Sequence, residues 1–399
     1  MPLKLTFSTV FILGLLSAIT PLAIDTYLPS IPTIARSIQT EVHLIQLTVS
    51  VYLMTFAIFQ LLFGPMSDAY GRRKVIFIGL FFYILGSLVC SFSYNYELLM
   101  SGRIIQAFGG AAVAVCVPAL VRDGLSNEQF VKAMSYVFLV MGMAPLLAPI
   151  LGGIILIAFD WHYIFIFLAL MTCITFFLFA VNIAETLPLS KRITFSLENI
   201  LTNYAQLLKN KGVMRHILSG SLHFGGLMCF VTGSSFVYIE FYGVDEANFG
   251  LLFGISVGAL ILFTTVNGQL VERVGIIKMT NVSIAIMLLA SCLFAGITLM
   301  KQPPLWSIVF ISTLFICTIG ALGSNLMVGA LNHAGSNSGS VVALAGTFRF
   351  MMGAIGGAVI SILHDGTFVP MISIMAACGF LSFATYVLMM APTALSKNV

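Results

Sequence analysis

The sequence predicts an all-α membrane protein of twelve transmembrane helices in two six-helix pseudo-repeats. First, 59% of the 399 residues are apolar and only 8% are charged, too few charges to solvate a water-soluble protein of this length. Second, twelve apolar segments can be delimited, and each has about the 18 to 25 residues that a helix needs to cross a bilayer. Third, two separate patterns recur at one common spacing of 204 residues (268 − 64 and 346 − 142).

The twelve segments define two halves that are joined by a polar connector. We expect the N-terminal bundle over residues 1–185, the connector over 186–215 and the C-terminal bundle over 216–399. Approximate limits of the spans are 6–34, 44–64, 75–94, 98–121, 134–158, 162–183, 216–239, 248–271, 276–298, 305–329, 339–363 and 367–391. Parallel repeats of this kind place a transport site between the halves, near the middle of the membrane.

Lysine and arginine predict the orientation of the chain. With a cytoplasmic N-terminus, fourteen basic residues fall in inner loops and ends, and only Arg36 and Lys301 fall outside. We therefore expect a multi-pass protein of the bacterial inner membrane with both termini in the cytoplasm. The formal charge of +4 follows from this topology and indicates no nucleic-acid partner.

The first segment carries an acidic residue, Asp25, deep in an apolar run that contains three prolines. An ionisable group at this depth is costly and usually faces a cavity or a partner. The string Asp25-Thr26-Tyr27-Leu28-Pro29, followed by Pro32, resembles the Bcr/CflA branch of drug–proton antiporters. One interpretation is a protonation site that is tuned by desolvation and a nearby cation. The alternative is an interfacial carboxylate in contact with outer water.

The second and third segments are separated by the run Gly64 to Lys74, which we interpret as a tight polar turn. Glycines allow a sharp turn, and Asp68 can meet a neighbouring cation or helix end. The run resembles the signature loop of the major facilitator superfamily, and the match covers five residues: Gly64, Asp68, Gly71, Arg72 and Arg73. The same offsets recur in the second half at Gly268, Glu272, Gly275 and Lys278. The resemblance implies a role for these loops in conformational change.

The fourth segment carries Arg103 about six residues inside the outer end, with Gln106 one turn later on the same face. In the family that the sequence resembles, an arginine and a glutamine at this spacing are associated with proton coupling. Asp25 also lies in the outer half of its helix, so the two charges can approach one another. The alternative is an arginine that snorkels to the outer interface. At the inner end, Arg122 and Asp123 are expected to pair and to position the helix against the Gly64–Lys74 turn.

The fifth segment carries a stripe of glycine and proline on one helix face, which allows close backbone approach and a bend. Its members are Gly142, Pro145, Pro149, Gly152 and Gly153. The run Ala144 to Gly153 resembles the antiporter signature of exporters in the superfamily, and this resemblance favours export over uptake.

The seventh segment carries His223, Phe224 and Phe230 on a helix rich in small residues. Phe224 and Phe230 are candidates for the wall of an apolar cavity, although aromatic residues in membrane helices more often pack or face lipid. His223 is expected to be a hydrogen-bonded packing residue.

The eleventh segment carries Arg349 near its middle, at the position that Pro145 occupies in the first half. A mid-membrane arginine needs a partner or water, and the flanking glycines indicate an interior face. Together with Asp25 and Arg103 it leaves a net charge of +1 inside the membrane, so we hypothesise a substrate with an acidic group. A neutral drug is the main alternative, and a purely structural arginine paired with backbone or with Asp25 is another.

These features predict a secondary transporter that exports a small molecule, drug-like or an acidic metabolite or chelator, against protons by alternating access. Proton coupling is assigned to Asp25 and Arg103. The expected substrate-binding residues are Asp25, Tyr27, Arg103, Gln106, Phe224, Phe230 and Arg349. No P-loop is present, so the energy source is an ion gradient, and we expect no cofactor or metal. The expected partners are a small-molecule substrate, protons and the bilayer, with the chain acting as a monomer.

Two other classes remain open. A proton-coupled importer of a small anionic nutrient would use the same scaffold. A membrane-embedded enzyme is the other, but the sequence has no metal-binding His-Glu-x-x-His motif and no nucleophile elbow.

Overall fold

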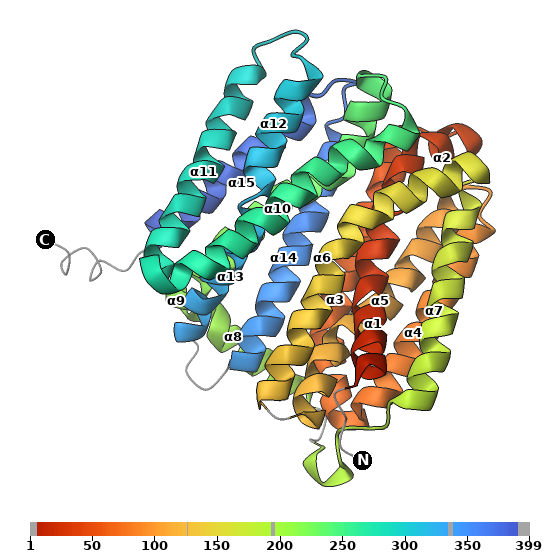
Figure 1. Ribbon diagram of the computed structural model, residues 1–399, viewed down its shortest axis with the longest axis vertical. Helices are drawn as coiled ribbons and strands as arrows, with labels where there is room; N and C mark the ends of the chain where they lie inside the picture. The colour runs from red at the N-terminus through yellow and green to blue at the C-terminus, as the bar shows by residue number, and fades with distance from the viewer. Residues whose placement is uncertain (1–5, 126, 193–195, 334–337, 390–399) are drawn as a thin grey trace, which may run out of the picture. The chain divides into compact units, whose positions relative to one another are not determined.

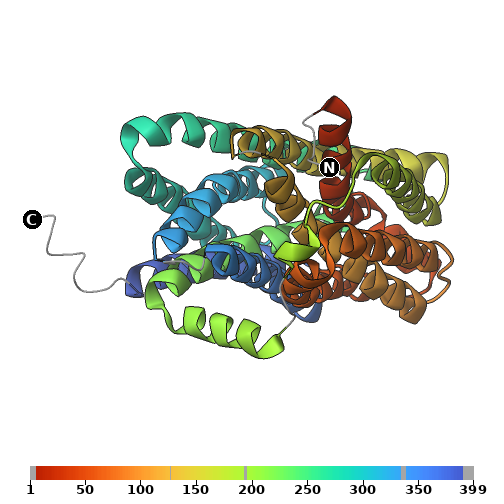
Figure 2. The ribbon, with the colours of Figure 1, turned by 90° about the horizontal axis from the view of Figure 1, so that it is seen from below.

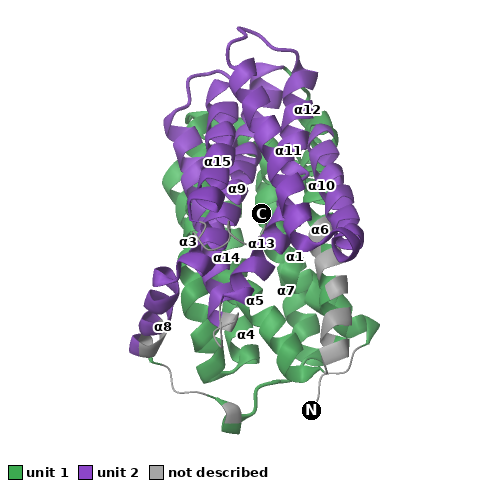
Figure 3. Cartoon of the chain, turned by 90° about the vertical axis from the view of Figure 1, so that its left-hand side faces the viewer, with its two compact units in different colours: residues 1–196, 243–251 green, residues 197–242, 252–399 purple. Residues whose placement is uncertain are grey.

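The structure, a computed structural model, describes residues 6–125, 127–192, 196–333 and 338–389. It divides into two compact units, shown in Figure 3. Unit 1 comprises residues 1–196 and 243–251, and unit 2 comprises residues 197–242 and 252–399. The boundary at 196/197 falls within the connector expected from the sequence.

Unit 1 is built from helices that run alongside one another (Figure 1). They are α1 (Phe7–Asp25), η1 (Leu28–Ser30), α2 (Ile31–Ser37), α3 (Val42–Tyr70), α4 (Arg72–Ser91), α5 (Tyr96–Gly124), α6 (Asn127–Ala158), α7 (His162–Asn182) and η2 (Leu189–Lys191). The first residues of α10 (Glu246–Val274) also belong to this unit.

Unit 2 contains the remaining helices, and Figure 2 shows them from below, with α8 seen lengthwise at the edge of the unit. They are α8 (Leu197–Lys209), α9 (Lys211–Ser235), the π-helix η3 (Phe236–Phe241), the rest of α10, α11 (Ile276–Ile297), α12 (Leu305–Ile316), α13 (Ile319–Asn332), α14 (Ser338–Ile362) and α15 (Val369–Leu388).

The helices are long and apolar enough to confirm the predicted membrane fold. Among the described residues, eleven helical spans reach the length and hydropathy of a membrane-crossing segment. Helix α6 supplies the twelfth, with Met143–Ala158 as its described apolar part. The chain is therefore an all-α membrane protein with twelve transmembrane helices.

Glycines allow α4 and α5 to pack with their backbones in contact. A Cβ on Gly86 would lie 2.7 Å from both Gln106 Cα and the Gly102 carbonyl oxygen, and one on Gly109 would lie 2.9 Å from Tyr83 Cα. Small residues at helix contacts permit this approach in membranes. The contact matters for function because it sets the position of Arg103 and Gln106 on α5.

The turn after the second span is shorter than predicted. Helix α3 continues to Tyr70 with Pro65 inside it, and α4 begins at Arg72, so the turn is the single residue Gly71 at φ +102°. The prediction of a polar turn over residues 64–74 was wrong in extent, because most of the run is helical. Gly275, 204 residues later (275 − 71), separates α10 from α11 at φ +90°. The repeat therefore recurs in backbone conformation, at positions that favour glycine.

Two further segments differ from the prediction. The tenth span is broken between α12 and α13 at Cys317 and Thr318, where the Thr318 hydroxyl donates to the Phe315 carbonyl at 2.9 Å. His223 reaches the same carbonyl with its Nε2 at 3.3 Å, which confirms it as a hydrogen-bonded packing residue.

The second difference is in the connector, which contains the amphipathic helix α8. Leu207 of this helix is buried against the unit 2 core.

Candidate functional site

Asp25 is the last residue of α1, at a break in the first span. Pro29 has no N–H to donate to the Asp25 carbonyl, so the α-helix ends there and the chain continues as η1. The Asp25 side chain is 6% exposed and forms no hydrogen bond or ion pair with any described residue. It is therefore a buried carboxyl group at a helix end, and the interfacial alternative, in which outer water bathes it, does not fit this burial.

Arg103 on α5 binds the last turn of α1. Its Nη1 donates to the Ala23 carbonyl at 3.0 Å, one of the carbonyls that a helix C-terminus leaves without an intrahelical partner. A cation is favoured at this end of a helix dipole. Arg103 is fully buried, so the snorkelling alternative is excluded. The expected approach of Arg103 to Asp25 is realised through the backbone two residues earlier, and no Asp25–Arg103 ion pair is present.

The Arg103 guanidinium contacts two tyrosine rings and the side-chain amide of Gln106. The rings of Tyr27 and Tyr52 have their centroids 4.8 and 4.6 Å from the guanidinium carbon. Nη1 also donates to Gln106 Oε1 at 2.7 Å, and Gln106 Nε2 donates to Ser87 at 2.8 Å. Nε and Nη2 of Arg103 have no hydrogen-bond partner among the described residues. The guanidinium therefore keeps donors free for an additional acceptor.

The glycine stripe of α6 packs directly on this break. A Cβ on Gly152 would overlap the Thr26 carbonyl and lie 3.0 Å from Pro29 Cγ, and one on Gly153 would lie 3.3 Å from the Glu246 carbonyl oxygen. The predicted close backbone approach is confirmed at these two glycines. Pro145 and Pro149 lie inside α6, which stays one helix. The surroundings of Gly142 lie outside the described side chains.

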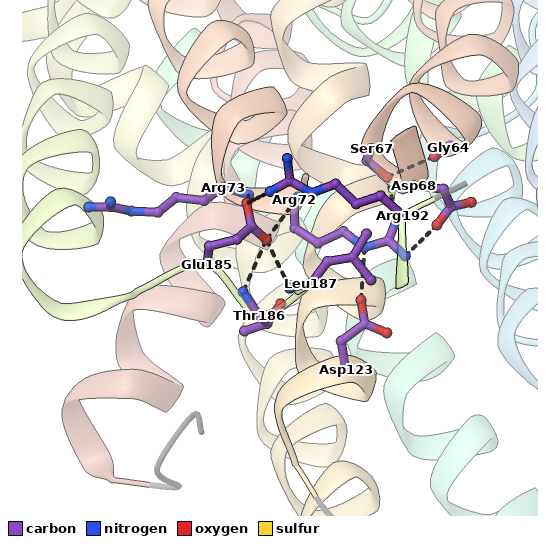
Figure 4. A network of polar contacts seen from close by, with 10 residues as sticks. All are labelled: Gly64, Ser67, Asp68, Arg72, Arg73, Asp123, Glu185, Thr186, Leu187 and Arg192. Carbon is purple, nitrogen blue, oxygen red and sulfur yellow. Dashed lines mark hydrogen bonds and ion pairs between the residues drawn. The ribbon is translucent and has the colours of Figure 1, made fainter. Parts of the chain in front are cut away.

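The loop motif forms a charge network around Arg72, shown in Figure 4. Arg72 is 4% exposed; its Nε donates to Asp123 Oδ2 at 2.9 Å, its Nη2 pairs with Asp68 and its Nη1 donates to the Ser67 hydroxyl. Asp123 was expected to position its helix against this motif, and it does so through Arg72. Its expected partner Arg122 is exposed and takes no part in the network.

Arg73 and Glu185 complete the network at the start of α4. Glu185 accepts the backbone N–H groups of Arg72 and Arg73, both at 3.1 Å, and so satisfies two donors at a helix N-terminus. The Arg73 side chain donates to the Ala180 carbonyl at 2.6 Å. Sequence reasoning missed Glu185; the only signal was an acidic residue just after an apolar span.

The second copy of the loop motif lacks this network. Its acidic residue Glu272 forms no ion pair among the described residues, because Ile276 stands where the first copy has Arg72 (276 − 72 = 204). A Cβ on Gly268 would meet no atom within 4 Å. The two copies therefore share a glycine turn and differ in electrostatics.

In unit 2, Arg349 projects from α14 beside a small cavity, which α9, α13 and α14 line. The Phe224 ring centroid lies 5.5 Å from the guanidinium carbon. Phe230 is only 1% exposed and stacks on Phe253 at 5.3 Å, so in this structure it is a packing residue and does not line the cavity.

Three residues of unit 1 were also expected to contact substrate: Tyr27, Arg103 and Gln106. All three are fully buried in this structure and present no surface to a ligand.

A buried amide pair in unit 2 was not anticipated. Asn267 on α10 and Asn325 on α13 each donate to the other's side-chain oxygen, at 3.3 and 3.1 Å. The sequence does not indicate this pair, because an asparagine in an apolar helix has no identifiable partner until the packing of the helices is known.

Comparisons with known proteins agree with this architecture. A sequence profile of the Major Facilitator Superfamily matches residues 13–357. The chain is 33% identical over 383 residues to a bicyclomycin resistance protein homolog of Haemophilus influenzae, covering 96% of each chain. It is 26% identical over 363 residues to the multidrug resistance protein MdtL of Escherichia coli, covering 91% of this chain and 90% of that one.

Solved transporter structures share the fold at low identity. A peptide transporter POT in complex with sulfate superposes with a TM-score of 0.78 at 12% identity, covering 99% of this chain and 96% of that one. The xylose transporter XylE from E. coli superposes with a TM-score of 0.73 at 14% identity, covering 98% and 99%. Both of these solved structures are transporters. The chain belongs to the Major Facilitator Superfamily of membrane transporters, in the branch that contains the bicyclomycin resistance proteins.

Proposed function

We propose that the protein exports a small molecule across the bacterial inner membrane in exchange for protons, with both termini in the cytoplasm. The observation that carries the proposal is the buried Asp25 at the end of α1, which has no partner among the described residues and lies in the same helical turn that Arg103 holds through the Ala23 carbonyl. A carboxyl group in such a place is the natural proton carrier of a membrane transporter. The similarity of the chain to proteins named for bicyclomycin resistance and multidrug resistance supports export.

The proposed coupling uses the free donors of Arg103. When Asp25 loses its proton, the buried carboxylate needs a cationic or hydrogen-bonding partner. Nε and Nη2 of Arg103 have no hydrogen-bond partner in the described part of the chain, and Arg103 is already bound to the same turn, so a movement of α1 that brings Asp25 to these donors supplies that partner. Proton binding then releases the turn. Because Gly152 packs on the Thr26 carbonyl, this movement is transmitted to α6.

The test is substrate-driven proton movement in everted membrane vesicles. An exporter that exchanges protons for cargo releases lumenal protons when substrate is added, and a proton-coupled importer does not. We expect Asp25→Asn to abolish this proton release while the protein remains folded. Asp160→Asn is the matched control, because Asp160 is an exposed carboxylate whose partners among the described residues, the Trp161 N–H and His162, are its neighbours in the sequence. Normal proton release by the Asp25 variant would contradict the proposed coupling.

A further inference from the structure

Arg349, a cation well inside a membrane span of unit 2, carries an inference about substrate class that rests on the proposed transport function. We infer that the cavity beside Arg349 is an anion subsite, which binds the carboxylate of an amphipathic monocarboxylic acid. The carboxylate lies on the guanidinium, and the apolar part of the molecule lies against the hydrophobic side chains around it.

The charge of Arg349 is not balanced within its unit. No ion pair or hydrogen bond joins its guanidinium to another described residue. All ion pairs among the described residues belong to unit 1, so the acidic residues described in unit 2 form none. Arg349 lies eleven residues after Ser338, or about 16 Å along α14 at 1.5 Å per residue, well inside the span. A cation at this depth without a partner is costly unless a ligand or water meets it.

The surroundings hold the guanidinium in place and leave its N–H groups free. The Phe224 ring packs against the guanidinium, with 5.5 Å between the guanidinium carbon and the ring centroid. On α13, Gly323 leaves room for Nη2, which would lie 3.4 Å from a Cβ at that position. Neither contact uses an N–H donor. A planar guanidinium presented in this way can bind a carboxylate through two parallel hydrogen bonds.

The remaining lining of the cavity selects for a single charge on an apolar body. The cavity has a volume of about 20 Å³, enough for a water molecule or a carboxylate oxygen, so the carboxylate enters it and the apolar body makes room by displacing the apolar side chains around it. The described residues that line it include no acidic one, and half of them are apolar: Ile217, Leu326, Met327, Ala330 and Ala345. His216 donates its Nδ1–H to the Gly212 carbonyl at 2.7 Å, so that N–H is unavailable to a ligand. A dianion would leave its second charge facing this apolar wall, and this favours a monoanion.

The experiment compares a carboxylate with its uncharged amide on the purified full-length protein in detergent. The probes are 4-phenylbutyrate and 4-phenylbutyramide, and their affinities are measured by calorimetry at neutral pH. We expect the wild type to prefer the carboxylate. Arg349→Gln should weaken carboxylate binding roughly tenfold or more and leave amide binding within about twofold, because only the charge-assisted contact is lost.

Two further variants keep the inference falsifiable. Arg215→Gln is the matched control, because the Arg215 guanidinium already binds the Tyr386 carbonyl at 2.6 Å and stacks on its ring; it should leave both affinities unchanged. Should Arg349→Gln fail to fold, Arg349→Lys keeps the charge and should still lose affinity for the carboxylate alone, because an ammonium is not bidentate. Equal loss for both probes, no loss for either, or a wild type without preference would overturn the inference.

Equilibrium binding needs no proton gradient, so this result is independent of coupling. Asp25→Asn should retain the preference for the carboxylate even though it loses proton exchange. A failure of the anion subsite therefore leaves the transport proposal standing, and a failure of proton exchange in vesicles leaves the binding result interpretable.

Discussion

Removal of Arg72 should destabilise unit 1 by an amount that the geometry of its charge network allows us to estimate. Breaking a buried ion pair by deleting one partner typically costs about 3–5 kcal/mol, because the other charge is left uncompensated. The Asp123 side chain retains 16% exposure and the Asp68 side chain 40%, so water relieves part of that cost. We therefore expect Arg72→Gln to lower the free energy of unfolding by about 2–3 kcal/mol.

A double-mutant cycle assigns this loss to the Arg72–Asp123 pair. In Arg72→Gln combined with Asp123→Asn no unpaired carboxylate remains, so the double variant should be less destabilised than the sum of the two single variants by about 1.5 kcal/mol. Asp68→Asn should cost less, about 0.5–1 kcal/mol, because its carboxylate is more exposed.

The assay is equilibrium unfolding of the purified protein in mixed detergent micelles, followed by far-UV circular dichroism. Lys74→Gln is the matched control: Lys74 is an exposed cation two residues away and should change stability by no more than about 0.5 kcal/mol. Equal costs for the Arg72 and Lys74 variants, or strictly additive effects in the cycle, would refute the assignment of the network to Arg72.

Three other perturbations follow from the packing and the caps. Gly86→Val should prevent accumulation of folded protein in the membrane, because the valine side chain would meet the α5 backbone at Gln106. Gly258→Val should express normally, because no atom lies within 4 Å of the added Cβ, and equal expression of the two variants would contradict the backbone contact. Gly152→Ala should reduce transport far more than Gly153→Ala, because only the added Cβ at position 152 would overlap the Thr26 carbonyl. Transport rates are compared in vesicles at matched expression, and similar rates for the two variants would contradict the contact between α6 and the end of α1. Glu185→Gln should lower the unfolding free energy by about 1 kcal/mol, because the N-terminus of α4 loses a charged cap. Glu272→Gln is the control, because Glu272 is exposed and lies in the last turn of α10, and an equal loss of stability in both variants would dismiss the cap.

Sequence reasoning located the parts of the fold that depend on local chemistry. Glycine turns at 71 and 275 were predictable because a sharp reversal between two helices favours a residue that tolerates positive φ. The close approach at Gly152 was predictable from a stripe of small residues on one helix face. The burial of Asp25 followed from an ionisable group in an apolar run.

What sequence reasoning could not supply depends on contacts between distant segments. Glu185 caps a helix that begins 113 residues earlier (185 − 72), and no local pattern indicates such a partner. The helix break at Cys317 and Thr318 contains no proline from which it could be predicted. The Phe315 carbonyl at this break accepts from the Thr318 hydroxyl and contacts His223 of another helix. The contact of Arg103 with the Ala23 carbonyl could not be predicted, because every residue has a backbone carbonyl and the sequence does not indicate which one accepts the hydrogen bond.

Proton release on substrate binding tests the central role of Asp25 most directly. The purified wild-type protein, in weakly buffered detergent with a pH indicator, receives a saturating substrate identified in the vesicle assay. We expect release of about one proton per chain from the wild type and from Asp160→Asn, and none from Asp25→Asn, although that variant still binds the substrate. Undiminished proton release from Asp25→Asn would show that another group exchanges its proton for cargo.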